Sequence, residues 1–344
     1  MTGLCRKLPV VNKKIKHGGN LREAAVLYDI PLENWMDLST GINPRAWQTP
    51  EVPSSVWQRL PESNDGLLSA AQNYYACDDL LAVAGSQFAI QSLPYCRQHS
   101  RVAIVSPCYA EHPYWWRQAG HDVLLISADE VEQYLPDIDV LLLINPNNPD
   151  ARLWPLLLLQ QWHQQLSAHG GWLVVDEAFM DSTPQHSILS LYPNIPQGLI
   201  VLRSIGKFFG LAGIRLGFLA APSKLLTKVE QMQGPWAVSH PARWLGTLAL
   251  SDQQWQKESR ELLLEQSKKL HKTLSPYFHN IQCSNYFCYF QHPQARQIKH
   301  QLAQQGVWTR LFENPSAIRF GLPKNDKEYR RLERFFSQLF HEIK

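Results

Sequence analysis

A lysine, a carboxylate and an arginine occur in the middle of the chain, where together they could do chemistry. Lys207 ends a Ser-Ile-Gly-Lys segment that begins at Ser204, Arg215 follows it, and Asp176 closes an apolar run upstream. A lysine amine can hold an aldehyde as a Schiff base, and a carboxylate can keep a pyridine nitrogen protonated so that the ring accepts electrons. A hydroxyl and a guanidinium can bind a phosphate. Pyridoxal phosphate has these requirements, so we expect it as cofactor, with Lys207 as the catalytic residue.

Each of these residues also has an ordinary interpretation. Lys207 alone could be a surface lysine at a strand-to-loop junction, and Asp176 could begin a turn. The two phenylalanines that follow Lys207 would desolvate its amine and favour the neutral form. A buried Asp176 needs a cationic partner, and a protonated pyridine would supply one. The combination with Arg215 therefore favours the cofactor site.

Further polar residues follow other apolar runs. Gly85, Ser86 and Gln87 open a helical pattern, where backbone N–H groups attract a phosphate, although N-capping by Ser86 explains this pattern equally well. Tyr109 could stack on the pyridine ring or be a packed core aromatic. Asn148 could hydrogen-bond the cofactor's phenolic oxygen or belong to a turn rich in Asn and Pro. Their clustering predicts that all five bind the cofactor.

The elements that must position these residues are those of a parallel sheet. Between residues 67 and 220, short apolar runs alternate with helical patterns, which predicts an α/β fold with a mostly parallel seven-stranded central sheet. The strands are expected at 80–84, 102–106, 123–126, 140–144, 173–176, 199–202 and 216–220, with helices at 87–95, 111–119 and 156–169. Ligands of such sheets bind at the carboxyl ends of the strands, where the candidate residues lie.

The pattern changes after residue 222. A long polar helix is expected at 244–274, strands at 286–290, 307–311 and 317–320, and helices at 295–305 and 326–343. We therefore expect a large cofactor-binding domain over 41–225 and a smaller α+β domain over 226–344. Residues 1–40 are expected to form an N-terminal arm that joins the small domain.

Composition restricts the partners. The chain has 33 basic and 30 acidic residues, a formal charge of +3, which is too balanced to predict nucleic-acid or membrane-surface binding. No apolar run is long enough to span a bilayer and no secretory leader is recognisable, so we expect a cytoplasmic location. The six cysteines show no CxxC spacing, so we expect them to be reduced and to bind no metal.

Four motifs in combination resemble those of the fold-type I, aspartate-aminotransferase-like enzymes, and the resemblance covers nearly the whole chain. They are Asn-Pro-Asn-Asn-Pro at 145–149, Asp-Glu-Ala-Phe at 176–179, the segment 204–215 that contains Lys207, and Ile-Arg-Phe-Gly at 318–321. They are similar to the branch that holds histidinol-phosphate aminotransferases and threonine-phosphate decarboxylases. The resemblance implies the cofactor roles given above and a homodimer.

The N-terminal region separates the two branches. His-Gly-Gly-Asn at 17–20 and Asp-Leu-Ser-Thr-Gly-Ile-Asn-Pro at 37–44 resemble the threonine-phosphate decarboxylases of cobalamin biosynthesis. That family implies conversion of L-threonine O-3-phosphate to (R)-1-amino-2-propanol O-2-phosphate, with Arg319 binding the substrate carboxylate. The other candidate substrate-binding residues are His17, Gly18, Gly19, Asn43 and Arg310, although His17 and Arg310 could equally be ordinary surface residues. The alternatives are an aminotransferase acting on histidinol phosphate or a similar compound, and a protein that keeps the fold for binding alone.

Three positions depart from the family's pattern. Phe179 stands where many relatives carry a tyrosine that hydrogen-bonds the cofactor, and Asp150-Ala151 replaces the usual Thr-Gly. Leu60 stands where aminotransferase relatives carry a tyrosine that reaches the partner subunit's cofactor phosphate. This last difference weakens the aminotransferase interpretation.

Overall fold

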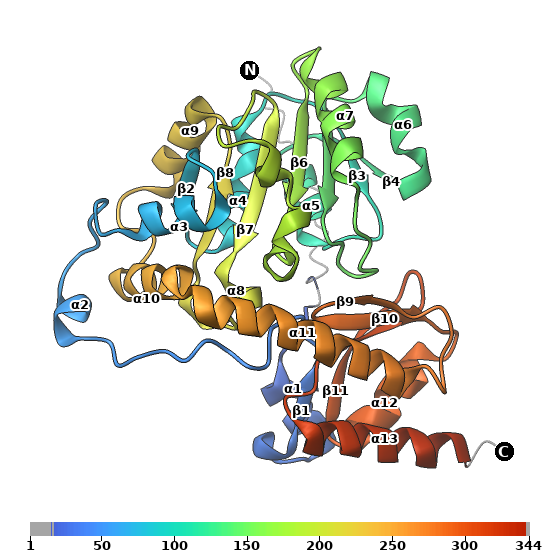
Figure 1. The fold of residues 1–344 in the computed structure, drawn as a ribbon. Coiled ribbons are helices and arrows are strands. Elements are labelled where there is room, and N and C mark those ends of the chain that lie inside the picture. Colours follow the sequence, from blue (N-terminus) through green and yellow to red (C-terminus); the bar gives the residue numbers. More distant parts are fainter. Residues whose placement is uncertain (1–14, 16, 342–344) are drawn as a thin grey trace, which may run out of the picture.

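The computed structural model describes residue 15 and residues 17–341, which form two β-sheets with their helices (Figure 1). The larger sheet has the strand order β2-β8-β7-β6-β5-β3-β4. Its strands are β2 Leu80–Val83, β3 Arg101–Val105, β4 Asp122–Ile126, β5 Val140–Ile144, β6 Trp172–Asp176, β7 Leu199–Ser204 and β8 Gly217–Ala220. The neighbours from β4 to β7 pair in parallel, and β8 is antiparallel to both of its neighbours. The predicted seven-stranded, mostly parallel sheet is confirmed.

Both faces of this sheet are covered. Along β5, Leu141 and Leu143 pack in one apolar cluster, whereas Val140 and Leu142 pack in a second one. Successive residues of a strand point to opposite faces, so a strand buried on both sides needs a continuous apolar run. The crossover helices are α4 Ser86–Ser92, α5 Glu111–Gln118, α6 Val131–Tyr134 and α7 Leu156–Ser167.

The second sheet has the order β1-β11-β12-β10-β9 and lies in the lower part of Figure 1. Its strands are β1 Met36–Leu38, β9 Gln282–Ser284, β10 Phe287–Gln291, β11 Val307–Phe312 and β12 Ala317–Gly321, and its helices are α1 Leu21–Tyr28, α12 Ala295–Gln304 and α13 Asp326–His341. β1 pairs in parallel with β11, so a segment from the start of the chain supplies an edge strand. The last two residues of the predicted final helix lie outside the described part.

The long helix predicted over 244–274 is two helices in the structure. α10 His240–Ser251 ends just before Asp252, and α11 Gln253–Leu274 begins just after it. The Asp252 carboxylate accepts the N–H of Trp255 at 3.0 Å, which caps α11, and it also accepts from Nε1 of Trp47. The prediction was wrong because α10 and α11 follow each other directly, and their combined pattern hides the cap.

The remaining helices bear on the expected domain boundaries. α9 Ser223–Gln233 contacts α4 and β2, and α10 packs on α3 Leu67–Tyr75, so both lie with the larger sheet. α11 then passes toward the smaller sheet, and α2 Ser54–Gln58 lies on a long loop at the left of Figure 1. The division into arm, large domain and small domain stays a prediction, and these contacts favour a boundary later than residue 225.

The expectation that all cysteines are reduced is wrong for one pair. Cys283 and Cys288 form a disulfide between β9 and β10, where the strand register places the two residues opposite each other. Their spacing is that of a tight hairpin, which a search for CxxC does not detect. Cys77, Cys96 and Cys108 are free thiols.

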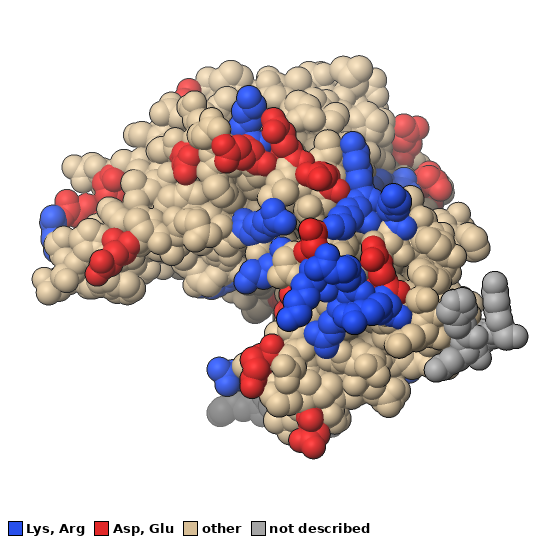
Figure 2. All heavy atoms as spheres, turned by 60° about the horizontal axis from the view of Figure 1, so that its bottom comes forward, with Lys and Arg blue, Asp and Glu red and all other residues tan. Residues whose placement is uncertain are grey.

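Charged side chains of both signs share the face shown in Figure 2, where Lys and Arg gather toward the middle with Asp and Glu among them. An ion pair joins α11 to α13, because Lys269 Nζ lies 2.6 Å from the Asp326 carboxylate.

No helix within the described residues has the length and apolar character needed to cross a bilayer. Within that same part of the chain, no group of three His, Cys, Asp or Glu side chains is placed to hold a metal ion.

Candidate active site

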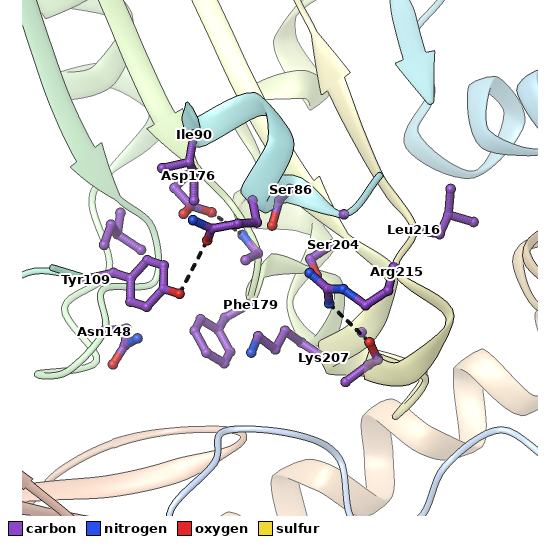
Figure 3. A pocket seen from close by; sticks show the side chains of 16 residues that line it. Ser86, Ile90, Tyr109, Asn148, Asp176, Phe179, Ser204, Lys207, Arg215 and Leu216 are labelled. Atoms are coloured by element: carbon purple, nitrogen blue, oxygen red, sulfur yellow. Dashed lines mark hydrogen bonds between the residues drawn. The ribbon is translucent and has the colours of Figure 1, made fainter. Parts of the chain in front are cut away.

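A cavity of about 160 Å³ lies at the carboxyl ends of the strands of the larger sheet (Figure 3). The loops after β2, β3 and β5 and the ends of β6 and β7 line this cavity. All nine residues predicted to bind the cofactor line it: Gly85, Ser86, Gln87, Tyr109, Asn148, Asp176, Ser204, Lys207 and Arg215. The structure therefore brings together residues that are far apart in sequence.

Lys207 lies in α8, Ile205–Phe208, directly after β7, and its side chain points into the cavity (Figure 3). Burial lowers the pKa of Lys207 to about 8, and the positive charges of Arg319 and Arg215 act in the same direction. Its ammonium nitrogen lies 5.4 Å from the centre of the Phe179 ring. The neutral amine, which attack on an aldehyde requires, therefore forms at a lower pH than in an exposed lysine.

Asp176 is buried at the end of β6 and is held by two hydrogen bonds. Its Oδ1 accepts the N–H of Ala178 at 3.0 Å, and its Oδ2 lies 2.9 Å from Nε2 of His112. Because a carboxylate only accepts, His112 must donate this bond. His112 belongs to α5 and was not predicted, because nothing in its own sequence surroundings marks it. It orients the carboxylate that would face a pyridine nitrogen.

The opposite end of the cavity carries donors for a phosphate. Ser86, Ser204 and Arg215 lie near one another there (Figure 3). Gly85 has φ +73°, and a Cβ at this position would lie 2.9 Å from the Arg215 guanidinium, so only glycine lets the loop approach so closely. Two hydroxyls and a guanidinium are a suitable donor set for a phosphate dianion.

The described residues thus fit pyridoxal phosphate. In Figure 3, Arg215 lies to the right of Asp176, Lys207 lies below these two residues, and Tyr109 lies at the left, beyond Asp176. Burial raises the pKa of Tyr109 to about 12, and its hydroxyl donates to Oε1 of Gln87 at 3.4 Å. Phe179 lines the same cavity without a hydroxyl, which agrees with the departure noted in the sequence.

Arg319 lies beside this cavity and contacts one of its walls. It donates to Oδ1 of Asn148 at 2.5 Å and to the carbonyl oxygen of Ser39 at 2.9 Å. Burial and the positive charge of Arg310 together lower the pKa of Arg319 to about 9. Its buried Nε has no hydrogen-bond partner among the described residues. One donor of a buried cation therefore remains for an anionic ligand.

Arg310 and Arg319 stand opposite each other where β11 pairs with β12. Like charges at directly opposite positions of two strands repel, and burial lowers the pKa of Arg310 as well. A bound anion would relieve this repulsion. The pair is therefore suited to a substrate that carries a carboxylate or a phosphate.

The N-terminal candidates divide into two groups, because His17 adjoins the cavity, whereas Gly18 and Gly19 contact Ser39. His17 Nε2 lies 2.9 Å from Oε1 of Glu111, and the His17 ring is 5.8 Å from that of Tyr109, so it adjoins the cavity. The Gly19 N–H donates to Oγ of Ser39 at 2.7 Å, and Gly18 packs against the same residue.

Asn43 is hydrogen-bonded to the segment that carries Lys207. Its Nδ2 donates to the carbonyl oxygen of Phe208 and to Ser259, and its Oδ1 accepts the N–H of Arg45. Its own N–H donates to the carbonyl oxygen of Lys207 at 3.0 Å. These bonds fix the segment that carries Lys207, and contact between Asn43 and the substrate stays a prediction.

Comparison with known proteins agrees with this site. Residues 66–334 match the family described as aminotransferase class I and II. The chain belongs to this family. It is 49% identical over 322 residues to a threonine-phosphate decarboxylase from Pseudomonas aeruginosa, covering 93% of this chain and 96% of that protein. It is 37% identical over 329 residues to a threonine-phosphate decarboxylase from a Sinorhizobium species, covering 92% of this chain and 96% of the relative.

Among solved structures, histidinol-phosphate aminotransferase from Sinorhizobium meliloti in complex with pyridoxal-5'-phosphate has a TM-score of 0.83 and 17% sequence identity. The match covers 100% of both chains and establishes the common fold. The comparisons confirm the fold class, the predicted dependence on pyridoxal phosphate and the resemblance to threonine-phosphate decarboxylases.

Proposed function

We propose that this protein is a pyridoxal-phosphate-dependent decarboxylase that converts L-threonine O-3-phosphate to (R)-1-amino-2-propanol O-2-phosphate in cobalamin biosynthesis. The observation that carries the proposal is the 49% identity to a threonine-phosphate decarboxylase across 93% of the chain. The arginine pair next to Lys207 supports it, because the substrate carries two anionic groups that need cationic partners.

In the proposed reaction, bound pyridoxal phosphate supplies the electron sink for the breaking bond. Lys207 holds the aldehyde, and Asp176, oriented by His112, stabilises a positive charge at the pyridine end of the cavity. Arg319 binds the substrate carboxylate through the donor that the protein leaves unused. Arg310 and His17 bind the phosphate of the substrate.

The bond from the α-carbon to the carboxylate breaks, and carbon dioxide leaves with the electron pair remaining behind. Because the amine of the substrate would replace that of Lys207 on the aldehyde, Lys207 would be free to deliver a proton to the α-carbon, which its lowered pKa facilitates. Arg319 and Arg310, by holding the carboxylate and the phosphate, would orient the α-carbon so that its bond to the carboxylate breaks. An orientation that favoured breaking the bond to hydrogen would begin transamination instead.

One incubation tests the proposal against its main alternative, an aminotransferase acting on histidinol phosphate or a similar compound. Purified protein given pyridoxal phosphate and L-threonine O-3-phosphate should release carbon dioxide without any 2-oxo acid. The Lys207→Ala variant, which keeps the rest of the site, should release none. Turnover that depends on 2-oxoglutarate and forms glutamate would reject the proposal in favour of the aminotransferase.

We also infer that the protein forms a homodimer and acts in the cytoplasm. Trp57 on α2, Leu60 after it and Trp236 before α10 are 66%, 61% and 60% exposed. α2 packs on α10, and the His240 ring lies 3.2 Å from the carbonyl oxygen of Arg59, so these apolar side chains lie on neighbouring elements. Large exposed apolar side chains that gather in this way are typical of a surface covered by a second subunit.

A further inference from the structure

Glu111 is a buried carboxylate beside the cavity that the proposed reaction does not use. It begins α5, its side chain is 11% exposed, and it does not line the cavity itself. Three donors converge on it. His17 Nε2 lies 2.9 Å from its Oε1, and Gln87 Nε2 and Trp115 Nε1 each donate to its Oε2 at 2.8 Å. A buried carboxylate needs such partners, and here they come from three separate segments.

Two of these partners reach the cavity. Gln87 lines it and accepts a hydrogen bond from the hydroxyl of Tyr109, the candidate stacking ring. The His17 ring is tilted against Tyr109 at a centroid distance of 5.8 Å. Glu111 therefore ties the cofactor wall formed by α4 to the N-terminal segment.

The N-terminal segment is anchored on its other side to the smaller sheet. A Cβ on Gly18 would lie 2.4 Å from the carbonyl oxygen of Ser39, and the Gly19 N–H donates to Oγ of Ser39. Trp308 of β11 donates from Nε1 to the carbonyl oxygen of Gly19 at 2.7 Å. Ser39 in turn accepts a hydrogen bond from Arg319. Residues 17–19 thus bridge α5 and the smaller sheet, next to the arginine that faces the substrate.

We propose that Glu111 is a positioning residue that fixes His17 as a phosphate-binding group. This inference rests on the proposed function, because His17 is there a ligand of the substrate phosphate. A carboxylate only accepts, so the His17 Nε2 proton points to Glu111 and leaves Nδ1 for the ligand. The contact with Glu111 thus fixes the orientation of the His17 ring and determines which ring nitrogen is left for a phosphate.

A double-mutant cycle with Glu111→Gln and His17→Ala tests the proposal. Glu111→Gln keeps the size of the side chain and removes its charge. We expect each single variant to raise KM for L-threonine O-3-phosphate about tenfold while kcat changes by less than about threefold, because a binding contact is lost. The double variant should be no worse than His17→Ala alone, because Glu111 acts through His17. If the increases in KM of the two single variants multiplied in the double variant, the proposal would be overturned.

Glu132→Gln is the matched control, since Glu132 is an exposed carboxylate of α6 and its removal should leave KM unchanged. Hydrogen exchange gives a readout that is independent of turnover. In the cofactor-loaded protein without substrate, Glu111→Gln should speed exchange at the Gly19 amide and leave β5 unaffected. Unchanged exchange at Gly19 would overturn the positioning role. Absence of carbon dioxide release by the unaltered protein would instead reject the proposed function, so the two failures are distinguishable.

Discussion

Lys207 lies among groups that disfavour its positive charge, and this environment follows from the order of residues around it. Phe208 is fully buried beside it, Phe179 contacts the amine, and Arg215 comes from the loop that returns to the sheet. The sequence contains these neighbours in order, so the role of Lys207 could be predicted. The pKa of about 8 adds a value that the sequence cannot supply, because burial depends on the packed structure.

The lowered pKa of Lys207 predicts how the cofactor-free protein responds to pH. Lys207 is protonated below about pH 8 and neutral above it, so uptake of pyridoxal phosphate should accelerate as the pH rises through 8 and then level off. An exposed lysine would show the rise about two units higher. Stopped-flow absorbance between pH 6 and 10 measures the rate of cofactor uptake. Lys207→Ala should lose the absorbance band of the covalently bound cofactor. A rate that is still rising steeply at pH 10 would contradict the buried environment.

His112 should matter through Asp176. His112→Ala removes the hydrogen bond to the Asp176 carboxylate, and we expect a loss of roughly 10- to 100-fold in kcat/KM or cofactor affinity. Cofactor titration and steady-state kinetics measure both quantities. His163→Ala is a suitable control, because His163 is buried on α7 and bonds the carbonyl oxygen of Gln197, away from the cavity. Equal losses in the two variants would show a general effect on folding.

Residues that act through another side chain were the ones that the sequence could not reveal. His112 and Glu111 reach their partners across the fold, and no spacing in the sequence reports such contacts. The hydrogen bonds from Asn43 to Phe208 and Lys207, which hold the lysine segment, were likewise not visible in the sequence. Only the site residues that follow the ends of strands were predictable, because the sheet itself places them.

Asp252 illustrates how one polar residue can separate two helices. Asp252 stands between α10 and α11, caps α11 and bonds the Trp47 indole. The separate strands and crossover helices were predictable because Gly and Pro bound their apolar runs. The break at Asp252 was not, since an aspartate also fits within an exposed helical face. The hairpin that joins Cys283 to Cys288 was missed for a similar reason, because the pairing depends on strand register.

The cap should be measurable in stability. Asp252→Ala removes the acceptor of the Trp255 N–H and of the Trp47 indole, so we expect the free energy of unfolding to fall by about 1–3 kcal/mol. Urea unfolding followed by circular dichroism measures this change. Asp252→Asn is the control, because asparagine caps helices about as well as aspartate and should retain most of the stability. A loss as large in Asp252→Asn would mean that the charge, and not the cap, matters.

The molecule as a whole consists of two sheets joined by α11, with the cavity on the larger sheet and Arg310 and Arg319 on the smaller one (Figure 1). The proposed substrate would therefore bridge the two parts. The arrangement of the larger sheet could be predicted from its strand pattern. The place of α9 and α10 beside that sheet could not, because it depends on contacts with α3, α4 and β2 that lie far away in the sequence.

The exposed apolar surface around α2 predicts the state of association. Trp57→Glu places a charge where we propose that a second copy packs, so the variant should sediment as a monomer while the unaltered protein sediments as a dimer. Analytical ultracentrifugation at working concentration measures this difference. Leu157→Glu, at an exposed position on α7, is the control and should leave the dimer intact. A monomeric unaltered protein would contradict the proposal.

β1 is made long before its partner β11, because the strands of the larger sheet lie between them in the sequence. While the chain is still on the ribosome, residues 36–38 remain without their neighbour until about residue 312 has left the exit tunnel. The larger sheet, whose strands end at residue 220, can assemble during that interval. Closure of the smaller sheet, and with it the placement of Arg319 beside Asn148, thus follows the synthesis of the whole larger sheet.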